Sequence, residues 1–494
     1  MRKIIKRLTV LFVAAVVAVF ALFGTACDKK DSSLEFIEEG KSVSYTKAKN
    51  WGSFEVYKHT YSRLGEDVFP IGGFAGPFQP QAPSFNGQVQ PDFLDDYYWE
   101  LFADCGVNMI VFTRNEYREM TSAVNRALDQ AAKHNMLFFV RDYQVSMLGA
   151  DNMDSLASVM AEYINHEGCG GIYGLDEPKS TDFARLKLLH EEFQSLNYED
   201  RDVYINMLPN YATTSAFGDY KTYEPFLRGY MEEVKMPYLS YDYYPFLSAS
   251  DNLDNINLAG YFKNIATIRA VAEDYKVPFW AFVQAGGQWS GEGGTPAMTE
   301  YPLYPSESAF LWNINTLLAY GMKGMEYFDL IQDPILEEIN IAEEPNNGRN
   351  YTRFGIVGAL GNINQWYYYA VKAAKQIHAI DEVLLNASSQ GIIAVGSRAS
   401  QLGTGEEIFQ NGKYRELTGV NGNNVIVGCF DYQGRTALYV VNNSIDEKQK
   451  INLSFDAKYG YDVTQRGETV SVAAETLPLT LEAGEGVLVV LRGE

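Results

Sequence analysis

The residues best suited to chemistry stand at the ends of short apolar runs. Asp176-Glu177-Pro178 directly follows one such run, and Asp242 and Glu326 lie in two later ones. A protonated carboxylic acid can donate to a leaving oxygen while a second carboxylate attacks carbon or activates water. A like charge nearby raises the pKa of a carboxyl group, so Asp176 is suited to keep Glu177 protonated. These residue types predict acid–base chemistry, with Glu177 as the candidate acid.

An alternative reading of the same tripeptide is a helix start, with a carboxylate near the amino-terminal dipole and proline in the first turn. Polar and aromatic residues after the other runs favour a functional site instead. These residues are Arg114, Asp142, Asn206, Tyr244, Gln284 and Trp289. We expect the two amides to hydrogen-bond hydroxyl groups, and Arg114 and Asp142 to form an ion pair that is either structural or ligand-binding. Tyr244 and Trp289 offer flat faces for a ring, or belong to the core or rim.

The elements that must position these residues alternate between short apolar strands and amphipathic helices. Helices are expected over stretches such as Asp92–Cys105, Thr121–His134 and Asp182–Leu196. The eight strands are expected at Phe69–Phe74, Asn108–Thr113, Leu137–Arg141, Gly171–Leu175, Val203–Met207, Tyr238–Tyr241, Phe279–Val283 and Gly324–Phe328. This rhythm predicts an α/β fold, a (β/α)₈ TIM barrel over residues 69–385, whose reacting groups lie at the carboxyl ends of the strands. A doubly wound sheet is the rival, but no glycine-rich phosphate turn follows the first strand.

The rest of the chain has a different pattern on each side of the barrel. Residues 28–68 are polar with short alternating pieces, which predicts a tether and short strands. From Gly391 onward, period-two strands separated by glycine and asparagine turns predict an all-β C-terminal sandwich over residues 390–494. Its expected role is to cap the barrel, with sugar binding as the alternative.

Three stretches resemble a known family. Gly170–Pro178 resembles the strand-4 Asn-Glu-Pro signature of the large clan of (β/α)₈ retaining β-glycosidases. Ser240–Pro245 and the lead from Trp312 to Phe328 are similar to strands 6 and 8 of family 42-type β-galactosidases. The resemblance implies that Glu177 is the acid/base, with Asp176 in place of the usual Asn. It also implies a nucleophilic Glu at the end of strand 7, where this chain has Gln284.

Because an amide cannot serve as that nucleophile, the second carboxylate must come from elsewhere. Asp242 or Glu326 could supply it from a neighbouring strand, or Glu292 could enter from the glycine-rich loop after strand 7. The sequence thus predicts a glycoside hydrolase acting on a neutral oligo- or polysaccharide. The alternative is a barrel that binds glycans without cleaving them. Sugar, linkage, stereochemical outcome and oligomeric state stay open.

Composition narrows the range of partners. The chain has 494 residues and a formal net charge of −23, which disfavours nucleic acid and polyanionic substrates. The five histidines fall away from the predicted strand ends, which argues against a Ser-His-Asp hydrolase and histidine-rich metal centres. No metal site or cofactor is therefore predicted. Cys105, Cys169 and Cys429 lack CxxC spacing and are expected to be buried free thiols.

The first 27 residues are typical of an export signal. A basic start is followed by an apolar run from Leu8 to Phe23, small residues and Cys27. This order resembles a bacterial lipoprotein signal, which implies that Cys27 becomes the lipidated first residue. The expected location is the cell surface, with the membrane as a partner through the lipid anchor. A plain cleaved signal or an uncleaved anchor is the alternative.

Overall fold

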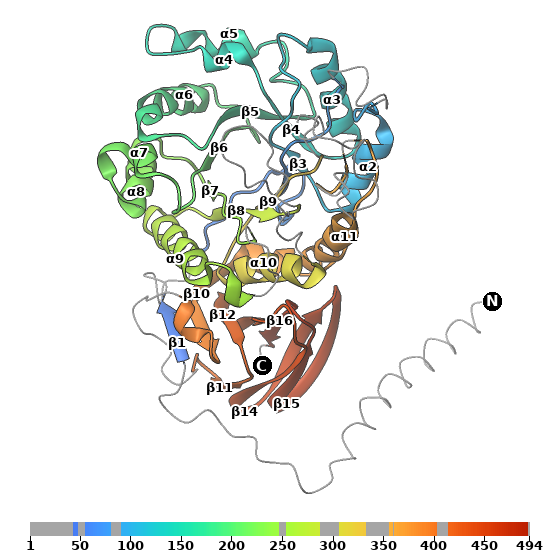
Figure 1. Ribbon diagram of the computed structural model, residues 1–494, viewed down its shortest axis with the longest axis vertical. Helices are drawn as coiled ribbons and strands as arrows, with labels where there is room; N and C mark the ends of the chain where they lie inside the picture. Colours follow the sequence, from blue (N-terminus) through green and yellow to red (C-terminus); the bar gives the residue numbers. More distant parts are fainter. Residues whose placement is uncertain are drawn as a thin grey trace, which may run out of the picture. The chain divides into compact units, whose positions relative to one another are not determined.

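The computed structural model describes residues 43–47, 55–80, 90–246, 253–286, 306–331, 355–358, 360–402 and 413–492. Eight parallel strands form a closed barrel, and the last strand pairs with the first (Figure 1). The strands are β2 (Ile71–Gly73), β3 (Met109–Ile110), β4 (Leu137–Val140), β5 (Cys169–Asp176), β6 (Asp202–Met207), β7 (Leu239–Tyr241), β8 (Phe279–Gln284) and β9 (Met325–Phe328). All eight predicted strands are present, so the predicted barrel is confirmed.

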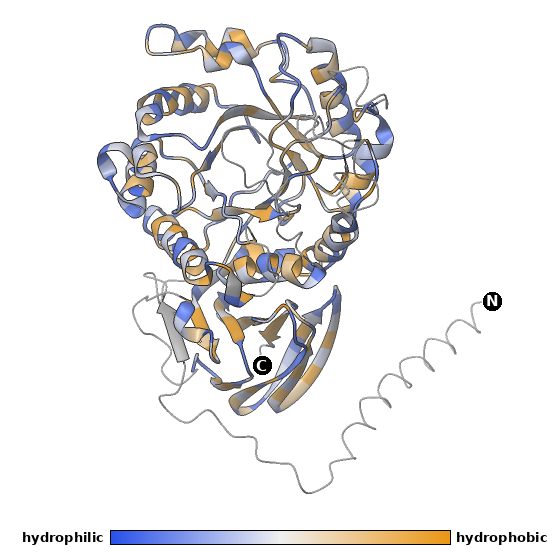
Figure 2. Cartoon of the chain, in the orientation of Figure 1, coloured by the Kyte–Doolittle hydropathy of each residue, from blue (hydrophilic) through white to orange (hydrophobic). Residues whose placement is uncertain are grey.

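Helices surround this barrel, and apolar and polar residues alternate along them, as Figure 2 shows in orange and blue. They are α2 (Asp96–Asp104), α3 (Thr121–Lys133), α4 (Tyr143–Ser146), α5 (Leu156–Met160), α6 (Phe183–Ser195), α7 (Thr214–Phe217), α8 (Tyr223–Glu233), α9 (Leu258–Tyr275), α10 (Glu307–Ala319), α11 (Gln365–His378) and α12 (Asp381–Asn386). Among the described residues, none of the helices is both long and apolar enough to cross a membrane.

A segment before the barrel, residues 55–68, packs against the amino-terminal ends of the strands. His59 Nε2 lies 2.6 Å from the carboxylate of Asp202, the first residue of β6. Arg63 donates to the main-chain oxygen of Cys169, the first residue of β5, at 2.6 Å. These contacts cover the end of the barrel opposite the one where (β/α)₈ barrels carry their chemistry.

The C-terminal region is all-β, as predicted, and its strands form one antiparallel sheet in the order β1-β10-β12-β13-β16-β14-β11, with β15 beside β14. The strands are β10 (Ala387–Val395), β11 (Leu417–Asn421), β12 (Val425–Tyr432), β13 (Arg435–Asn442), β14 (Gln449–Gln465), β15 (Glu468–Leu481) and β16 (Gly486–Leu491). One strand comes from far away in the sequence: β1 (Val43–Lys47) pairs with β10. The polar stretch before the barrel therefore contributes an edge strand to this sheet.

Helix α10 packs between the barrel and the C-terminal sheet, and nearly all of its side chains are therefore buried. Trp312 donates from its indole nitrogen to Asn443 at 2.8 Å, and Asn315 donates to the main-chain oxygen of Gly484 at 2.8 Å. A Cβ at Gly428 would stand 2.1 Å from the carbonyl oxygen of Ala319, so the sheet approaches the end of this helix closely. Glycine is required there because of that approach.

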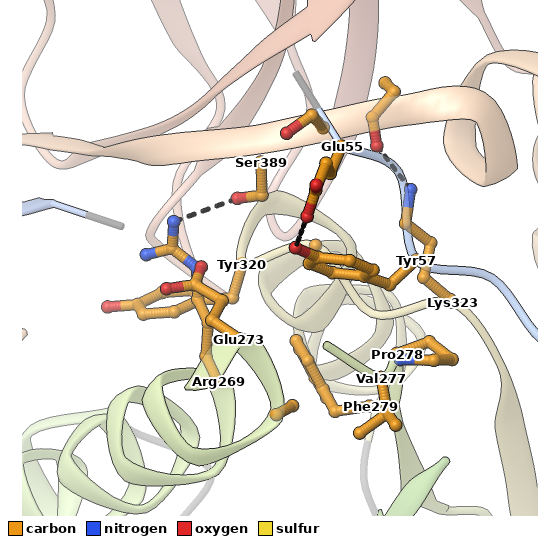
Figure 3. A pocket seen from close by; sticks show the side chains of 14 residues that line it. Glu55, Tyr57, Arg269, Glu273, Val277, Pro278, Phe279, Tyr320, Lys323 and Ser389 are labelled. Atoms are coloured by element: carbon orange, nitrogen blue, oxygen red, sulfur yellow. Dashed lines mark hydrogen bonds and ion pairs between the residues drawn. The ribbon is translucent and has the colours of Figure 1, made fainter. Parts of the chain in front are cut away.

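A pocket lies at the same junction, beside α9 and the start of β10 (Figure 3). Arg269 pairs with Glu273 at 3.0 Å and donates to Ser389 at 3.0 Å. The buried amino group of Lys323 donates to main-chain oxygens, including that of Ala387 at 2.6 Å. These charged groups bind other parts of the protein and hold the barrel to the sheet.

Cys105, Cys169 and Cys429 are buried free thiols, as predicted. Cys27, Trp289 and Glu292 lie outside the described residues, and so does most of the predicted tether. The lipid anchor and the stacking role of Trp289 therefore stay predictions.

Candidate active site

The acid predicted from the sequence stands at the carboxyl end of β5. Asp176 is the last residue of the strand and pairs with Asn206 on β6. Glu177 follows with a φ of +49° and donates its amide hydrogen to the carbonyl oxygen of Asn206 at 2.9 Å. A left-handed conformation is uncommon for a residue other than glycine and occurs where the surrounding structure enforces it. Here it turns the chain out of the strand and leaves Glu177 exposed at the barrel mouth.

Asn206 holds the neighbouring carboxylates in place. Its side chain is 1% exposed, and Nδ2 donates to Asp176 Oδ1 at 3.1 Å. The amide also opposes the rise in the pKa of Asp242, while Oδ1 accepts from the hydroxyl of Ser240 at 2.8 Å. This use corrects the prediction that Asn206 binds a substrate hydroxyl, because its amide is fully engaged inside the protein. It positions acidic groups instead.

Asp242, at the end of β7, lies within hydrogen-bonding reach of the Glu177 carboxyl group. Asp242 is only 6% exposed, whereas Glu177 is exposed. Burial and the charges of Glu177 and Asp176 hold the pKa of Asp242 well above its usual range. Although Glu177 reaches solvent, partial desolvation by its neighbours and the charge of Asp176 raise its pKa, and hydrogen bonding with Asp242 partly offsets the rise. Two neighbouring carboxyl groups cannot both ionise readily, so the charge of Glu177 contributes to the raised pKa of Asp242.

The other two acids lie at different depths. Burial raises the pKa of Asp176 to about 6, against the opposing effect of the hydrogen bond from Asn206. Glu326 on β9 has no exposed surface, and burial raises its pKa to about 8. Of the two strand residues left open as second carboxylate, the structure places Asp242 beside Glu177 and Glu326 inside the barrel, where a substrate does not reach it; the third candidate, Glu292, lies outside the described residues.

Aromatic rings border the carboxyl pair. Tyr244 is 8% exposed, and the charges of Asp242, Asp176 and Glu177 contribute to its raised pKa, after burial. Burial and the charges of Asp242 and Glu177 also raise the pKa of Tyr211. This residue is 48% exposed. Sequence reasoning missed Tyr211, although it follows the end of β6 by only four residues. Tyr211 therefore presents an exposed ring beside the acids, whereas Tyr244, for which a stacking role was predicted, is buried.

The predicted ion pair between Arg114 and Asp142 is wrong. Asp142 binds Arg118 instead, with contacts of 2.8 and 3.1 Å, and also accepts from the hydroxyl of Tyr163 at 3.1 Å. Its side chain is fully buried, so it acts as a structural anion rather than a ligand for substrate. The guanidinium of Arg114 lies 4.5 Å from the centre of the Phe78 ring. The two residues follow neighbouring strands, but a nearer arginine satisfies the aspartate.

Removing Arg118 should therefore destabilise the fold. In Arg118→Met the buried carboxylate of Asp142 loses its cationic partner, and we expect the free energy of unfolding to fall by about 3–5 kcal/mol. Chemical denaturation measures this loss. The matched control is Arg126→Met, whose partner Asp92 is 31% exposed and whose loss should cost about 0–1 kcal/mol. Equal losses in the two variants would contradict the structural role of Asp142.

Gln284 also serves the fold. It ends β8 and is 1% exposed. Its side chain accepts from the amide of Phe246 at 3.0 Å and donates to the carbonyls of Phe246 at 3.1 Å and Gly286 at 3.2 Å. This corrects the prediction that Gln284 binds a sugar hydroxyl: its amide holds together the segments that follow β7 and β8. No group of three or more His, Cys, Asp or Glu side chains among the described residues is arranged to hold a metal ion.

Comparisons with known proteins add little at the level of sequence. No family model matches the chain, and no curated protein matches it. Among solved structures, the chain is similar to a β-L-arabinopyranosidase from Geobacillus stearothermophilus, with 10% identity, a TM-score of 0.46 and coverage of 88% of this chain and 100% of that one. It is also similar to an Anoxybacillus α-amylase, with 12% identity, a TM-score of 0.44 and coverage of 87% and 98%. A GH30 endoxylanase from Clostridium papyrosolvens has 12% identity, a TM-score of 0.41 and coverage of 89% and 98%. Similarity this distant says nothing about the reaction, which has to be inferred from the site itself.

Proposed function

We propose that the protein hydrolyses glycosidic bonds in a neutral oligo- or polysaccharide, with Glu177 as general acid/base and Asp242 as the second carboxylate. The observation that carries the proposal is the position of these two carboxyl groups, one exposed and one buried, directly after β5 and β7, the two strands that flank β6 in the barrel. Raised pKa values at both groups favour a state with one proton on the pair. One group can then donate a proton while the other carries the negative charge.

In the proposed reaction, Glu177 donates its proton to the glycosidic oxygen as the bond from that oxygen to the anomeric carbon breaks. In the free protein the pKa of Asp242 is raised more strongly than that of Glu177, so substrate binding has to leave the proton on Glu177 and Asp242 ionised. Asp242 then attacks the anomeric carbon, and water that gives its proton to Glu177 later releases the sugar, or Asp242 takes a proton from a water molecule that attacks that carbon directly. The charge of Asp176 favours the protonated form of Glu177. Tyr211 would support a sugar ring next to the pair.

A substrate has to part the two carboxyl groups. In the free protein the two groups are close enough for Asp242 to lower the pKa of Glu177 by hydrogen bonding, whereas the carboxyl groups stand roughly 5–5.5 Å apart in retaining enzymes and roughly 6.5–9.5 Å apart in inverting ones. Because Glu177 is the exposed member, we infer that it rotates away as the sugar enters. The separation reached with substrate bound then decides the stereochemical outcome.

The same contact supports a second candidate, a protein that binds neutral glycans without cleaving them. A pair that stayed in contact would leave no room for a reacting bond, and Gln284 occupies the end of β8, where the resembled clan has its nucleophile. The neutral character of the ligand is inferred for either function, because the net charge of −23 and three acids at the mouth disfavour an anionic sugar.

A panel of neutral polysaccharides, oligosaccharides and aryl glycosides separates the two candidates. Hydrolysis predicts that wild-type protein releases reducing ends from at least one member of the panel. Binding should be followed on the same panel by calorimetry. Glycan binding by the wild type without any release would contradict hydrolysis and favour the second candidate.

We also propose that the protein is tethered to the cell surface through a lipid on Cys27. The support is the order of the first residues: a basic start, an apolar run, small residues and then cysteine. Expression of the full chain in bacteria with an alkyne-labelled fatty acid should label the wild type and leave Cys27→Ser unlabelled. Equal labelling of both would contradict the tether.

A further inference from the structure

A chain of hydrogen-bonding side chains runs from inside the barrel to the carboxyl pair. Glu326 Oε1 lies 3.1 Å from the hydroxyl of Tyr204, and this hydroxyl lies 3.4 Å from that of Ser240. Ser240 donates to Asn206 Oδ1 at 2.8 Å, and Asn206 donates onward to Asp176 at 3.1 Å and opposes the rise in the pKa of Asp242. The four residues that lead to the two aspartates come from β6, β7 and β9. We call this set, Glu326, Tyr204, Ser240 and Asn206, the buried chain.

The buried chain is sealed from water. Each of its four side chains is 1% exposed or less. Glu326 stands opposite Gly72 on β2, where a Cβ would lie 2.6 Å from Glu326 Cγ, so only glycine leaves room for it. The titratable groups that interact with Glu326 are Tyr61, Tyr204, Tyr238 and Asp176, none of them cationic. A carboxyl group in such surroundings keeps its proton.

The proton on Glu326 completes the hydrogen bonds. The structure gives Tyr204 as the donor to Glu326 Oε1, and a proton on Oε1 reverses this bond. Glu326 then donates to Tyr204, the Tyr204 hydroxyl donates to Ser240, and Ser240 donates to the oxygen of Asn206. The amide of Asn206 is thereby held with its oxygen toward Ser240 and its nitrogen toward the two aspartates. Without that proton, Tyr204 must donate its one hydroxyl hydrogen to the carboxylate of Glu326. Since Ser240 already donates to Asn206, no hydrogen then lies between Tyr204 and Ser240, and their hydrogen bond is lost.

We propose that Glu326, Tyr204 and Ser240 are positioning residues that fix the orientation of the Asn206 amide, and so determine the protonation of Asp176 and Asp242. This inference concerns the same site as the proposed function. Only its prediction for kcat rests on the proposed function. Glu326 does not touch substrate in this account. It acts at the far end of the buried chain as a hydrogen-bond donor.

The test uses variants that break the chain at different points. Ser240→Ala and Tyr204→Phe each remove one hydroxyl, which frees the Asn206 amide to turn its oxygen toward Asp176. Glu326→Gln keeps a donor facing Tyr204, whereas Glu326→Leu removes it. The matched control is Tyr238→Phe, which removes a buried hydroxyl outside the chain from a ring 6.4 Å from that of Tyr204.

The measurement is the titration of the Asp176 and Asp242 carboxyl groups by ¹³C NMR on the full-length protein labelled at aspartate side chains. Loss of donation from Asn206 should raise the pKa of Asp176 by about 1 in Ser240→Ala, Tyr204→Phe and Glu326→Leu. Glu326→Gln and Tyr238→Phe should leave it where it is in the wild type. Unchanged titration of both aspartates in Ser240→Ala and Tyr204→Phe would overturn the proposal, and so would an equal rise in Tyr238→Phe.

This titration needs no substrate, so its outcome is independent of whether the protein cleaves glycosides. Where a substrate is in hand, the same variants give a second readout. The three variants that interrupt the buried chain, Ser240→Ala, Tyr204→Phe and Glu326→Leu, should show a kcat about tenfold lower with KM nearly unchanged. Glu326→Gln should keep kcat within about threefold of the wild type. A loss in Glu326→Gln as large as in Glu326→Leu would contradict the donor role.

Discussion

Glu177→Gln should lower kcat/KM by about 10³-fold or more on glycosides whose leaving group is a sugar, and by far less on those with an acidic phenol. Glutamine keeps the size of the side chain but cannot donate a proton to the departing oxygen, and general acid catalysis contributes about 10²–10⁴-fold. A phenol of low pKa leaves without that help. The size of the loss should therefore increase steadily with the pKa of the leaving group.

Rates for a series of aryl glycosides with phenols of increasing pKa measure this dependence. The control is Glu100→Gln, an exposed glutamate on α2, which should behave like the wild type. Thermal unfolding should be nearly the same for Glu177→Gln and the wild type, because the side chain is exposed. A loss of equal size on every leaving group would show that Glu177 acts in some way other than as the acid.

Asp242→Asn should lower activity by at least about 10³-fold on glycosides with good and with poor leaving groups, because the second carboxylate acts in both reactions. Azide should restore part of the rate on an activated aryl glycoside. It enters the space of the lost carboxylate and bonds to the anomeric carbon as the bond to the phenol breaks, giving a glycosyl azide. Rescue is expected because Asn fills the site without supplying a negative charge.

Product analysis by mass spectrometry detects the glycosyl azide. Asp129→Asn is the matched control, since that side chain is 75% exposed on α3, and it should keep wild-type activity and form no azide product. If Asp242→Asn keeps more than about a tenth of wild-type activity, the second carboxylate is another residue, and Glu292 becomes the next candidate.

Much of the barrel could be predicted because strands that are buried on both faces read as short apolar runs with turns between them. All four residues of β4 are buried, and so are all six of β8. The strand ends then place Glu177 and Asp242 at one face of the barrel, since the carboxyl ends of parallel strands meet there. Their contact follows from the fold class together with their positions on barrel strands 4 and 6.

Other parts of the site depend on side-chain directions that spacing does not show. From the sequence, Asp142 could form an ion pair with either Arg114 or Arg118. The path of the chain after β3 determines that Arg118 is the residue that reaches it. Gln284 was predicted to bind substrate because it ends a strand. Its side-chain amide instead hydrogen-bonds to the backbone of Phe246. The register of β1 against β10 joins positions about 350 residues apart, which no local pattern indicates.

The central claim is that a glycosidic bond is cleaved between Glu177 and Asp242. The most direct measurement is a crystal structure of Glu177→Gln with a neutral oligosaccharide that the wild type cleaves. We predict that the glycosidic oxygen lies within hydrogen-bonding distance of the side chain at position 177. The anomeric carbon should face Asp242, with the two side chains parted to roughly 5–5.5 Å or 6.5–9.5 Å. An oligosaccharide bound away from both residues, or a side chain at position 177 still in contact with Asp242 when the sugar is bound, would contradict the account.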